Sequence, residues 1–444
     1  MTVTRSFAIV LALILTACEG SPTLPPRVQA APRPASTSHP ASKAGCSTRH
    51  GKAKAPAPQL SAWGKRLNRL AADRSVGIAV ADRGNILYER QGDARRTPAS
   101  NEKLLLSMAL FDQLGPDLQI RTTTAAHRVV DGVVRGDLWL LGGGDPSLTS
   151  KAAHFWGPLR SATLKLLAER LRGAGISHIE GSIRGATTYF AHDFDAPGWQ
   201  PFVPRSYVEL PTALAINGNY HVRGSPERTA ARFLDRQLRA HGVQVDGAPG
   251  TGEPPAHLVQ VAQVSSPPLS RLIGFMDRTS NNFYAEMLGK LLGADLYGPP
   301  GTIHKGAAAI KSWARRSGVH IAAYDSSGLS YRDRISPRGV VRLLAAAGRR
   351  PWGPELRHDL PSPGQGTLRG RLAGLDVHAK TGTLFNSDSA LSGWVRNRRS
   401  GRWLEFSILD QNMPKTVEDR MVQVIATARV PVGHGPRRRR AVCS

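Results

Sequence analysis

Acidic residues are scarce in this chain, and the deficit sets its charge. The 444 residues contain 33 Asp and Glu against 59 Lys and Arg, a formal net charge of +26. Such a field attracts anionic partners without selecting one. The sequence lacks zinc-finger spacing, a recognition-helix signature and aromatic residues interleaved with basic ones, so nucleic acid is not the expected partner. We expect an anionic envelope surface, and an arginine-rich composition with no partner is the alternative.

Two common catalytic patterns are also missing. None of the 14 histidines stands in a His-Glu-x-x-His pattern, which argues against a zinc peptidase. The glycine run 142–144 lacks the Gly-Lys-Ser/Thr ending of a phosphate-binding loop and is expected to form a turn. We therefore expect neither a metal nor a cofactor.

No apolar run is long enough to cross a bilayer. The segment Phe7–Leu15 is apolar but too short. It follows Arg5 and ends in Leu-Thr-Ala before Cys18, which resembles a bacterial lipoprotein signal. Residues 1–18 are thus predicted to direct export to the periplasm or cell envelope, with Cys18 as the lipidated residue and the link to the membrane. An ordinary cleaved signal is the alternative, and it too implies export.

Cysteine is rare, because the chain has only three. Besides Cys18 there are Cys46 and Cys443, which flank the region expected to fold. In an oxidising compartment these two could form a disulfide. The pairing is a hypothesis that rests on their number and position alone.

The composition changes along the chain and predicts a divided fold. The segment 19–59 is rich in Pro, Ala and Ser and should be an extended tether. The remaining predicted parts are a catalytic domain of residues 60–122 and 264–430, an inserted β-rich region of residues 123–263, and a basic tail of residues 431–444.

Apolar periodicity predicts helices packed on a mainly antiparallel sheet, an α+β fold. Helices are expected at residues 60–72, 103–111, 269–278, 282–292, 304–317 and 337–347, with one more in the insertion at 164–171. Strands are expected in a hairpin of residues 76–81 and 86–90, and later at 377–384, 390–395 and 403–409.

The first chemical motif is a serine followed three residues later by a lysine. Ser100 and Lys103 stand where a largely apolar helix begins, one turn apart on one face, with about 5 to 6 Å between Cβ atoms. A neutral Lys103 could remove the Ser100 proton and make it a nucleophile. Neutrality near pH 7 requires the lysine pKa to fall well below its ordinary value, through burial and through repulsion by a second cation such as Lys380. The alternative is that Ser100 merely caps the helix.

A second motif, Ser280-Asn281-Asn282, opens the next apolar helix. Ser280 is a candidate to pass a proton to the leaving amine, and Asn282 to hold a substrate amide. Ordinary helix capping is the alternative for both.

A third motif, Lys380-Thr381-Gly382, lies in a predicted strand that continues to Thr383. Lys380 and the two threonine hydroxyls are candidates to bind a terminal carboxylate. Gly382 would let a peptide lie against the strand edge. The backbone N–H groups of Ser100 and Thr383 would form an oxyanion hole. A plain surface strand is the alternative.

These three motifs, in this order, resemble the D-alanyl-D-alanine carboxypeptidase and endopeptidase family, the class C low-molecular-mass penicillin-binding proteins. The similarity spans residues of about 60 to 415 and includes four further segments: Gly136–Leu148, Tyr284–Glu286, Asp325–Ser330 and Gly366–Leu368. The resemblance implies a β-lactamase-like transpeptidase domain interrupted by a large insertion. It also implies peptidoglycan peptides as substrates, an acyl-enzyme on Ser100, and β-lactams as covalent inhibitors.

Two positions depart from the family pattern. Asn281 replaces the usual aspartate of the second motif, which should alter local hydrogen bonding without abolishing catalysis. Ala186 stands where many relatives carry an acid, which leaves open whether the enzyme prefers diaminopimelate or lysine in the substrate. Asp193 and Asp195 are nearby, but neither is assumed to replace that acid.

Two other functions share parts of this pattern. A secreted β-lactamase would carry the same three motifs and would need a glutamate after the second motif to activate water. Glu286 is close in sequence but fits better as a helix residue. A non-catalytic lipoprotein that binds peptidoglycan through its basic surface is the other alternative. Carboxypeptidase and endopeptidase action, the oligomeric state and the choice of membrane are not separable from these residues.

Overall fold

The computed structural model describes residues 60–150, 159 and 161–431. Cys18, Cys46, Cys443, the predicted signal and nearly all of the tether and basic tail lie outside the described residues. Lipidation and the disulfide therefore stay predictions. Across the described ranges, no helix combines the length and apolar character needed to span a membrane.

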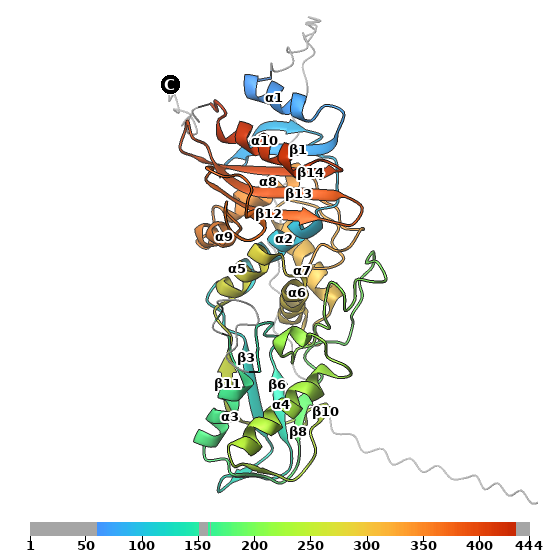
Figure 1. The fold of residues 1–444 in the computed structure, drawn as a ribbon, viewed down its shortest axis with the longest axis vertical. Coiled ribbons are helices and arrows are strands. Elements are labelled where there is room, and N and C mark those ends of the chain that lie inside the picture. Colours follow the sequence, from blue (N-terminus) through green and yellow to red (C-terminus); the bar gives the residue numbers. More distant parts are fainter. Residues whose placement is uncertain (1–59, 151–158, 160, 432–444) are drawn as a thin grey trace, which may run out of the picture. The chain divides into compact units, whose positions relative to one another are not determined.

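An antiparallel sheet of five strands forms the centre of the predicted catalytic domain, in the order β12-β13-β14-β1-β2 (Figure 1). The strands are β1 (Ser75–Asp82), β2 (Asn85–Arg90), β12 (Val377–Thr383), β13 (Asp388–Arg396) and β14 (Trp403–Gln411). β1 and β2 form the predicted hairpin, and β1 also pairs with β14 from the far end of the described chain. β12 pairs with β13 alone in this sheet, so its other edge is an edge of the sheet.

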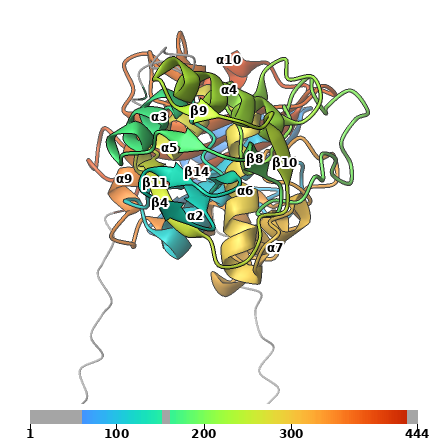
Figure 2. The ribbon, with the colours of Figure 1, turned by 90° about the horizontal axis from the view of Figure 1, so that it is seen from below.

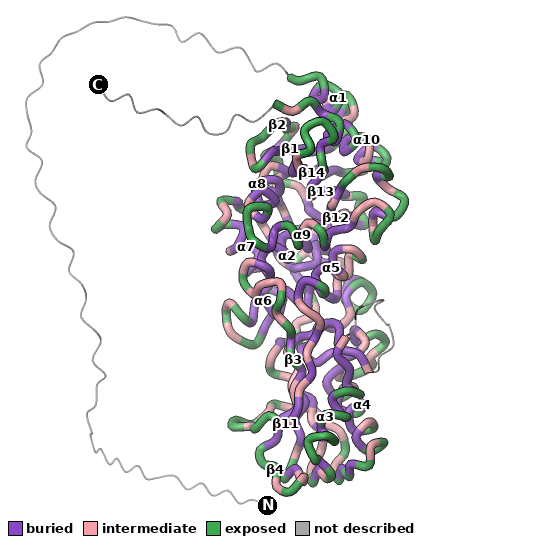
Figure 3. The backbone as a smooth tube through the Cα atoms, turned by 90° about the vertical axis from the view of Figure 1, so that its left-hand side faces the viewer, coloured by how far each residue is buried: buried purple, intermediate pink, exposed green. Residues whose placement is uncertain are grey.

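Both faces of this sheet are covered by helices. Neighbouring residues of a strand face opposite sides, and Ile408 and Leu409 of β14 accordingly belong to two different cores. The core on one side includes α1 (Ala62–Leu70) and α10 (Lys415–Ala426), which Figure 1 places beside each other. The central strands are buried along most of their length, as Figure 3 shows. Such two-sided burial explains the unbroken run of small and apolar residues in β1, Val76–Ala81.

The core on the opposite face of the sheet is formed mainly by helices. It includes the two helices at whose N-terminal ends the first and second motifs lie. Its helices are α2 (Glu102–Leu114), α5 (Leu269–Thr279), α6 (Asn282–Tyr297), α7 (Ile303–Arg316), α8 (Pro337–Ala347) and α9 (Gly353–Asp359). α6 and α7 lie side by side in both views (Figures 1 and 2). α9 and α10 were not predicted from the sequence.

The predicted insertion has a sheet and a hydrophobic core of its own. Its strands are β3 (Arg121–Ala126), β6 (Leu138–Gly142), β8 (Ile183–Ala186), β10 (Gly250–Gly252) and β11 (Val259–Ser265), in the order β10-β8-β6-β3-β11. β3 and β11 pair from Arg121 with Ser265 onward, so the chain enters and leaves along neighbouring strands. The predicted boundaries at 123 and 263 fall inside these two strands. Short strands form a second sheet: β4 (Val129–Val130), β5 (Val133–Val134), β7 (His178–Ile179) and β9 (Gln244–Val245).

The described residues of the predicted insertion contain two α-helices, whereas the sequence predicted one. α3 (Leu164–Gly173) is the predicted helix, and α4 (Pro226–Ala240) is the additional one. α4 carries the signals of a helix start, because Ser225 accepts a hydrogen bond from the Arg228 N–H and a proline follows at once. Its buried residues Ala230, Leu234 and Leu238 recur every four positions, the spacing of one helix face.

Candidate active site

Ser100 lies in a tight turn that leads into α2. Ala99 has a left-handed backbone with φ of 47°, and residues Ala99–Asn101 form a short 3-10 helix before Glu102. Asn101 occupies the N-cap position of α2 and makes no side-chain cap. The Ser100 hydroxyl instead meets Lys103, with 3.1 Å between Nζ and Oγ. The capping alternative for Ser100 therefore does not describe this turn.

Lys103 is fully buried and has three polar partners. Its Nζ lies 3.1 Å from Ser100 Oγ, 2.7 Å from Asn282 Oδ1 and 2.6 Å from the Ser327 carbonyl oxygen. A neutral amine has two N–H groups and one lone pair. Asn282 and Ser327 supply acceptors for both N–H groups, so the lone pair is left for the Ser100 hydroxyl proton. The Asn282 orientation fits, because its Nδ2 donates to the Tyr207 carbonyl at 3.1 Å.

Burial is the main cause of the lowered pKa of Lys103, which falls to about 8. Buried acids oppose this fall, Asp325 and Glu286 most strongly. Repulsion between Lys103 and Lys380 acts on the pKa of Lys380, which burial first and Lys103 second lower to about 7. The sequence predicted that burial and repulsion by Lys380 would both lower the pKa of Lys103. Burial lowers it, whereas the repulsion between the two lysines lowers the pKa of Lys380.

The second motif joins α5 to α6. Ser280 has a left-handed backbone with φ of 55°, and its Oγ lies 2.9 Å from Lys380 Nζ. Asn281 is the residue that caps α6, by accepting from the Tyr284 N–H at 2.9 Å. An aspartate oxygen can accept the same bond, so the departure at Asn281 keeps the cap. The Ser280 and Asn282 side chains are thereby left to face the two lysines.

The third motif places Lys380 inside the site and Gly382 against the turn that carries Ser100. A Cβ on Gly382 would lie 3.0 Å from Ala99 Cβ, from the Pro98 carbonyl oxygen and from the Ser100 nitrogen. The missing side chain thus lets β12 approach Ser100. That this glycine also makes room for a substrate peptide stays a prediction.

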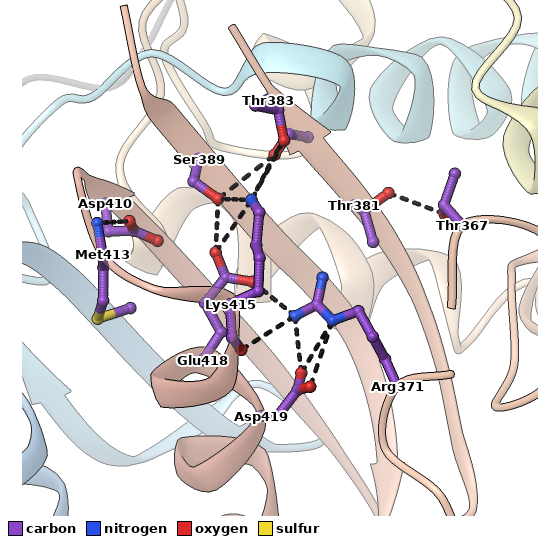
Figure 4. Close-up of polar contacts among 11 residues, drawn as sticks. Thr367, Arg371, Thr381, Thr383, Ser389, Asp410, Met413, Lys415, Glu418 and Asp419 are labelled. Atoms are coloured by element: carbon purple, nitrogen blue, oxygen red, sulfur yellow. Dashed lines mark hydrogen bonds and ion pairs between the residues drawn. The ribbon is translucent and has the colours of Figure 1, made fainter. Parts of the chain in front are cut away.

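The two threonine hydroxyls of β12 have partners that the sequence did not reveal. Thr381 donates to the Thr367 hydroxyl at 2.8 Å. Thr383 donates to the Gly382 carbonyl at 2.7 Å and accepts from Lys415 Nζ at 3.1 Å. Figure 4 shows Lys415 reaching from the start of α10 toward Thr383. The sequence around Lys415 does not predict this contact, because Lys415 and Thr383 are 32 residues apart and meet only when the sheet and α10 are folded together.

The segment Asp325–Ser330 supplies the backbone carbonyl that Lys103 contacts. Glu286 Oε1 accepts from the Ser326 and Ser327 N–H groups at 3.1 and 2.8 Å. Gly328 has φ of 78°, and a Cβ there would come within 1.9 Å of the Ala99 carbonyl oxygen. Burial raises the pKa of Glu286 to about 8. Glu286 is therefore a support for this loop, and its contacts are not those of a residue that activates water.

The insertion also reaches the site. The Tyr207 carbonyl accepts from Asn282, and Trp199, also in the predicted insertion, donates from Nε1 to Asp325 Oδ2 at 2.6 Å. Asp193 is engaged elsewhere, with 2.7 Å from its Oδ1 to Lys290 Nζ and with its Oδ2 accepting from the Ile303 N–H. Ala186 is buried at the end of β8, beside Gly252.

Comparison of the sequence with known proteins finds one peptidase family and relatives that are named carboxypeptidases. The profile of the D-Ala-D-Ala carboxypeptidase 3 (S13) family matches residues 64–224 and 222–428. The chain is 27% identical to a D-alanyl-D-alanine carboxypeptidase of Actinomadura sp. (strain R39), over 77% of this chain and 79% of the relative. It is 30% identical to carboxypeptidase Rv3627c of Mycobacterium tuberculosis, over 77% of both chains.

The fold agrees with that of a solved relative. Penicillin-binding protein 4 (dacB) of Haemophilus influenzae superposes with a TM-score of 0.68 at 19% identity, covering 82% of this chain and 98% of that one. The α+β transpeptidase-like fold predicted from the sequence is thereby confirmed, and the family profile spans both the predicted catalytic domain and the predicted insertion. The chain belongs to the D-Ala-D-Ala carboxypeptidase 3 (S13) family.

Proposed function

We propose that this protein is a serine D-Ala-D-Ala carboxypeptidase or endopeptidase that cuts peptidoglycan peptides through an acyl-enzyme on Ser100. The observation that carries the proposal is the contact of Ser100 with a buried lysine of lowered pKa. Ser280 and Lys380 form a second pair close by. The two pairs are linked because Ser280 contacts Lys380 while Asn282, two residues later, contacts Lys103. Membership of the family and the names of its carboxypeptidase relatives support the substrate class.

The reaction begins when Ser100 Oγ attacks the carbonyl carbon of the penultimate D-alanine and Lys103 takes the hydroxyl proton. The N–H groups of Ser100 and Thr383 stabilise the oxyanion. As the C–N bond breaks, the leaving nitrogen takes a proton from Ser280, whose hydroxyl recovers one from Lys380. Before the second half of the reaction, Lys103 loses one proton and Lys380 regains one, so the charge of the site is unchanged. Water then attacks the ester and gives its proton to Lys103, which returns it to Ser100 Oγ as the ester bond breaks.

Binding of the departing residue also has a physical basis. A terminal carboxylate close to Lys380 would raise the pKa of that lysine, because an anion stabilises the ammonium form. Near neutral pH the site would thus gain its positive charge as substrate enters. Thr381, Gly382 and Thr383 lie along the same strand edge and are proposed as the substrate-binding residues.

Covalent labelling tests the proposal. Incubation with a fluorescent penicillin should label the wild-type protein, mass spectrometry should place the adduct on Ser100, and Ser100→Ala should abolish labelling. Digestion of purified pentapeptide and cross-linked muropeptides then separates carboxypeptidase from endopeptidase action. Rapid continuous penicillin hydrolysis would instead identify a β-lactamase, and binding to sacculi without any labelling a non-catalytic lipoprotein.

The same proposal includes a place in the cell. The segment before Cys18 supports export, and lipid attachment at Cys18 would hold the enzyme to a membrane of the envelope. The excess of basic residues fits an anionic envelope surface as an additional partner.

A further inference from the structure

Three aromatic side chains meet on the surface of the protein. Phe202, Tyr207 and Phe385 are 47%, 46% and 45% exposed. Their ring centroids lie 5.8 Å apart for Phe202 and Tyr207, 5.0 Å for Phe202 and Phe385, and 4.6 Å for Tyr207 and Phe385, all near edge-to-face. Single exposed apolar residues are ordinary, but a contiguous group is typical of a binding surface.

This aromatic cluster, Phe202, Tyr207 and Phe385, is attached directly to the candidate active site. The Tyr207 carbonyl accepts the hydrogen bond from Asn282, which also contacts Lys103. Beneath the rings, Val203 and Val208 of the insertion share a small buried core with Leu384 and with Ala99, the residue before Ser100. The rings are thus exposed while the two segments that carry them are packed in place.

The direction of β12 indicates which part of a substrate the cluster would face. Lys380 stands three residues before Thr383, about 10 Å along the strand at 3.3 Å per residue. Phe385 lies beyond Thr383, in the turn that joins the end of β12 to β13. In the proposed function, Lys380 lies toward the departing residue and the Thr383 N–H toward the attacked carbonyl. Phe385 then lies on the acyl side of the bond that is cut.

We propose that the aromatic cluster is a subsite for an uncharged, apolar and preferably flat group on the acyl side of the scissile bond. The three side chains carry no charge, and aromatic rings offer large apolar area with preferred edge and stacking geometries. The subsite rests on the proposed function and adds to it a preference for acyl donors. Donors with such a group react faster than donors that lack it.

The test compares two β-lactams with the same nucleus. Benzylpenicillin carries a phenylacetyl group on the acyl side, and 6-aminopenicillanic acid has a free amine there. The second-order rate constant of acylation is measured for both reagents with the wild-type protein, Phe202→Ala, Phe385→Ala and the double variant. Tyr297→Ala is the matched control, because Tyr297 is 46% exposed and lies at the opposite end of α6 from Asn282, about 22 Å along the helix.

The double variant should react about 10- to 100-fold more slowly with benzylpenicillin, the loss expected for two aromatic contacts. Its reaction with 6-aminopenicillanic acid should stay within about twofold of the wild type, a change near zero on the free-energy scale. Phe385→Tyr should retain the preference, and Tyr297→Ala should change neither constant. Equal slowing of both reagents, or no slowing of either, would overturn the subsite. Failure of the wild-type protein to react with either reagent would overturn the proposed function, and the subsite with it.

Discussion

At the scale of single residues, the proposed reaction depends on the protonation states of Lys103 and Lys380, which are both buried. Lys103 is buried beside Ser100, and we expect Lys103→Ala to slow acylation by a β-lactam about 100- to 10,000-fold, the usual effect of losing a general base. The measurement is single-turnover labelling, with the melting temperature recorded to confirm folding. Acylation at a rate near that of the wild type would remove Lys103 from the role of base.

The pH dependence follows from the same lysine. The pKa of Lys103 is about 8, and only the deprotonated amine can accept the Ser100 proton. The acylation rate constant should therefore rise about tenfold per pH unit at low pH. Because the proposed reaction also needs a protonated Lys380, whose pKa is about 7, the rate constant should fall again above pH 8. The check is a profile of the acylation rate against pH with benzylpenicillin, whose side chain does not titrate in this range. A flat profile between pH 6 and 9 would contradict a lysine base.

At the scale of the elements, the approach of β12 to the turn before α2 brings two motifs together. We expect Gly382→Ala to slow acylation about 10- to 100-fold by displacing Ser100, since small misplacements of reacting atoms are costly, and to destabilise the fold by about 1–3 kcal/mol through overpacking. Gly173→Ala is the control, because a Cβ at Gly173 meets nothing within 4 Å. Equal acylation by both variants would show that the close approach has no part in catalysis.

Many of the helices and strands could be predicted from the sequence because apolar runs and their spacing are local patterns. The helix that carries Lys103 follows from a buried apolar run, and the position of Ser100 one turn before Lys103 follows from the three-residue spacing. The role of Gly382 did not follow, because its neighbours Pro98 and Ala99 are almost three hundred residues away in sequence. Lys415 was missed for the same reason, since its partner Thr383 lies in another element.

At the scale of the whole molecule, attachment to the membrane depends on Cys18. Lipidated protein should partition into the detergent-rich phase of a cell-envelope extract, and Cys18→Ser should move it to the aqueous phase, because the acyl chains supply the apolar area that membrane binding requires. Cys46→Ser is the control and should partition as the wild type does. The lipid hypothesis fails if the Cys18 variant remains with the detergent.

The sequence by itself determined which residues could carry acyl transfer, because a serine one helical turn from a lysine and a Lys-Thr-Gly strand are local patterns. Tertiary structure decided the rest. The pairing of β12 with β13 and the meeting of α5 with α6 bring Ser280 to Lys380 and Asn282 to Lys103. Burial by residues from distant segments lowers both lysine pKa values. Contacts and desolvation are properties of packing between segments, and no local spacing encodes them.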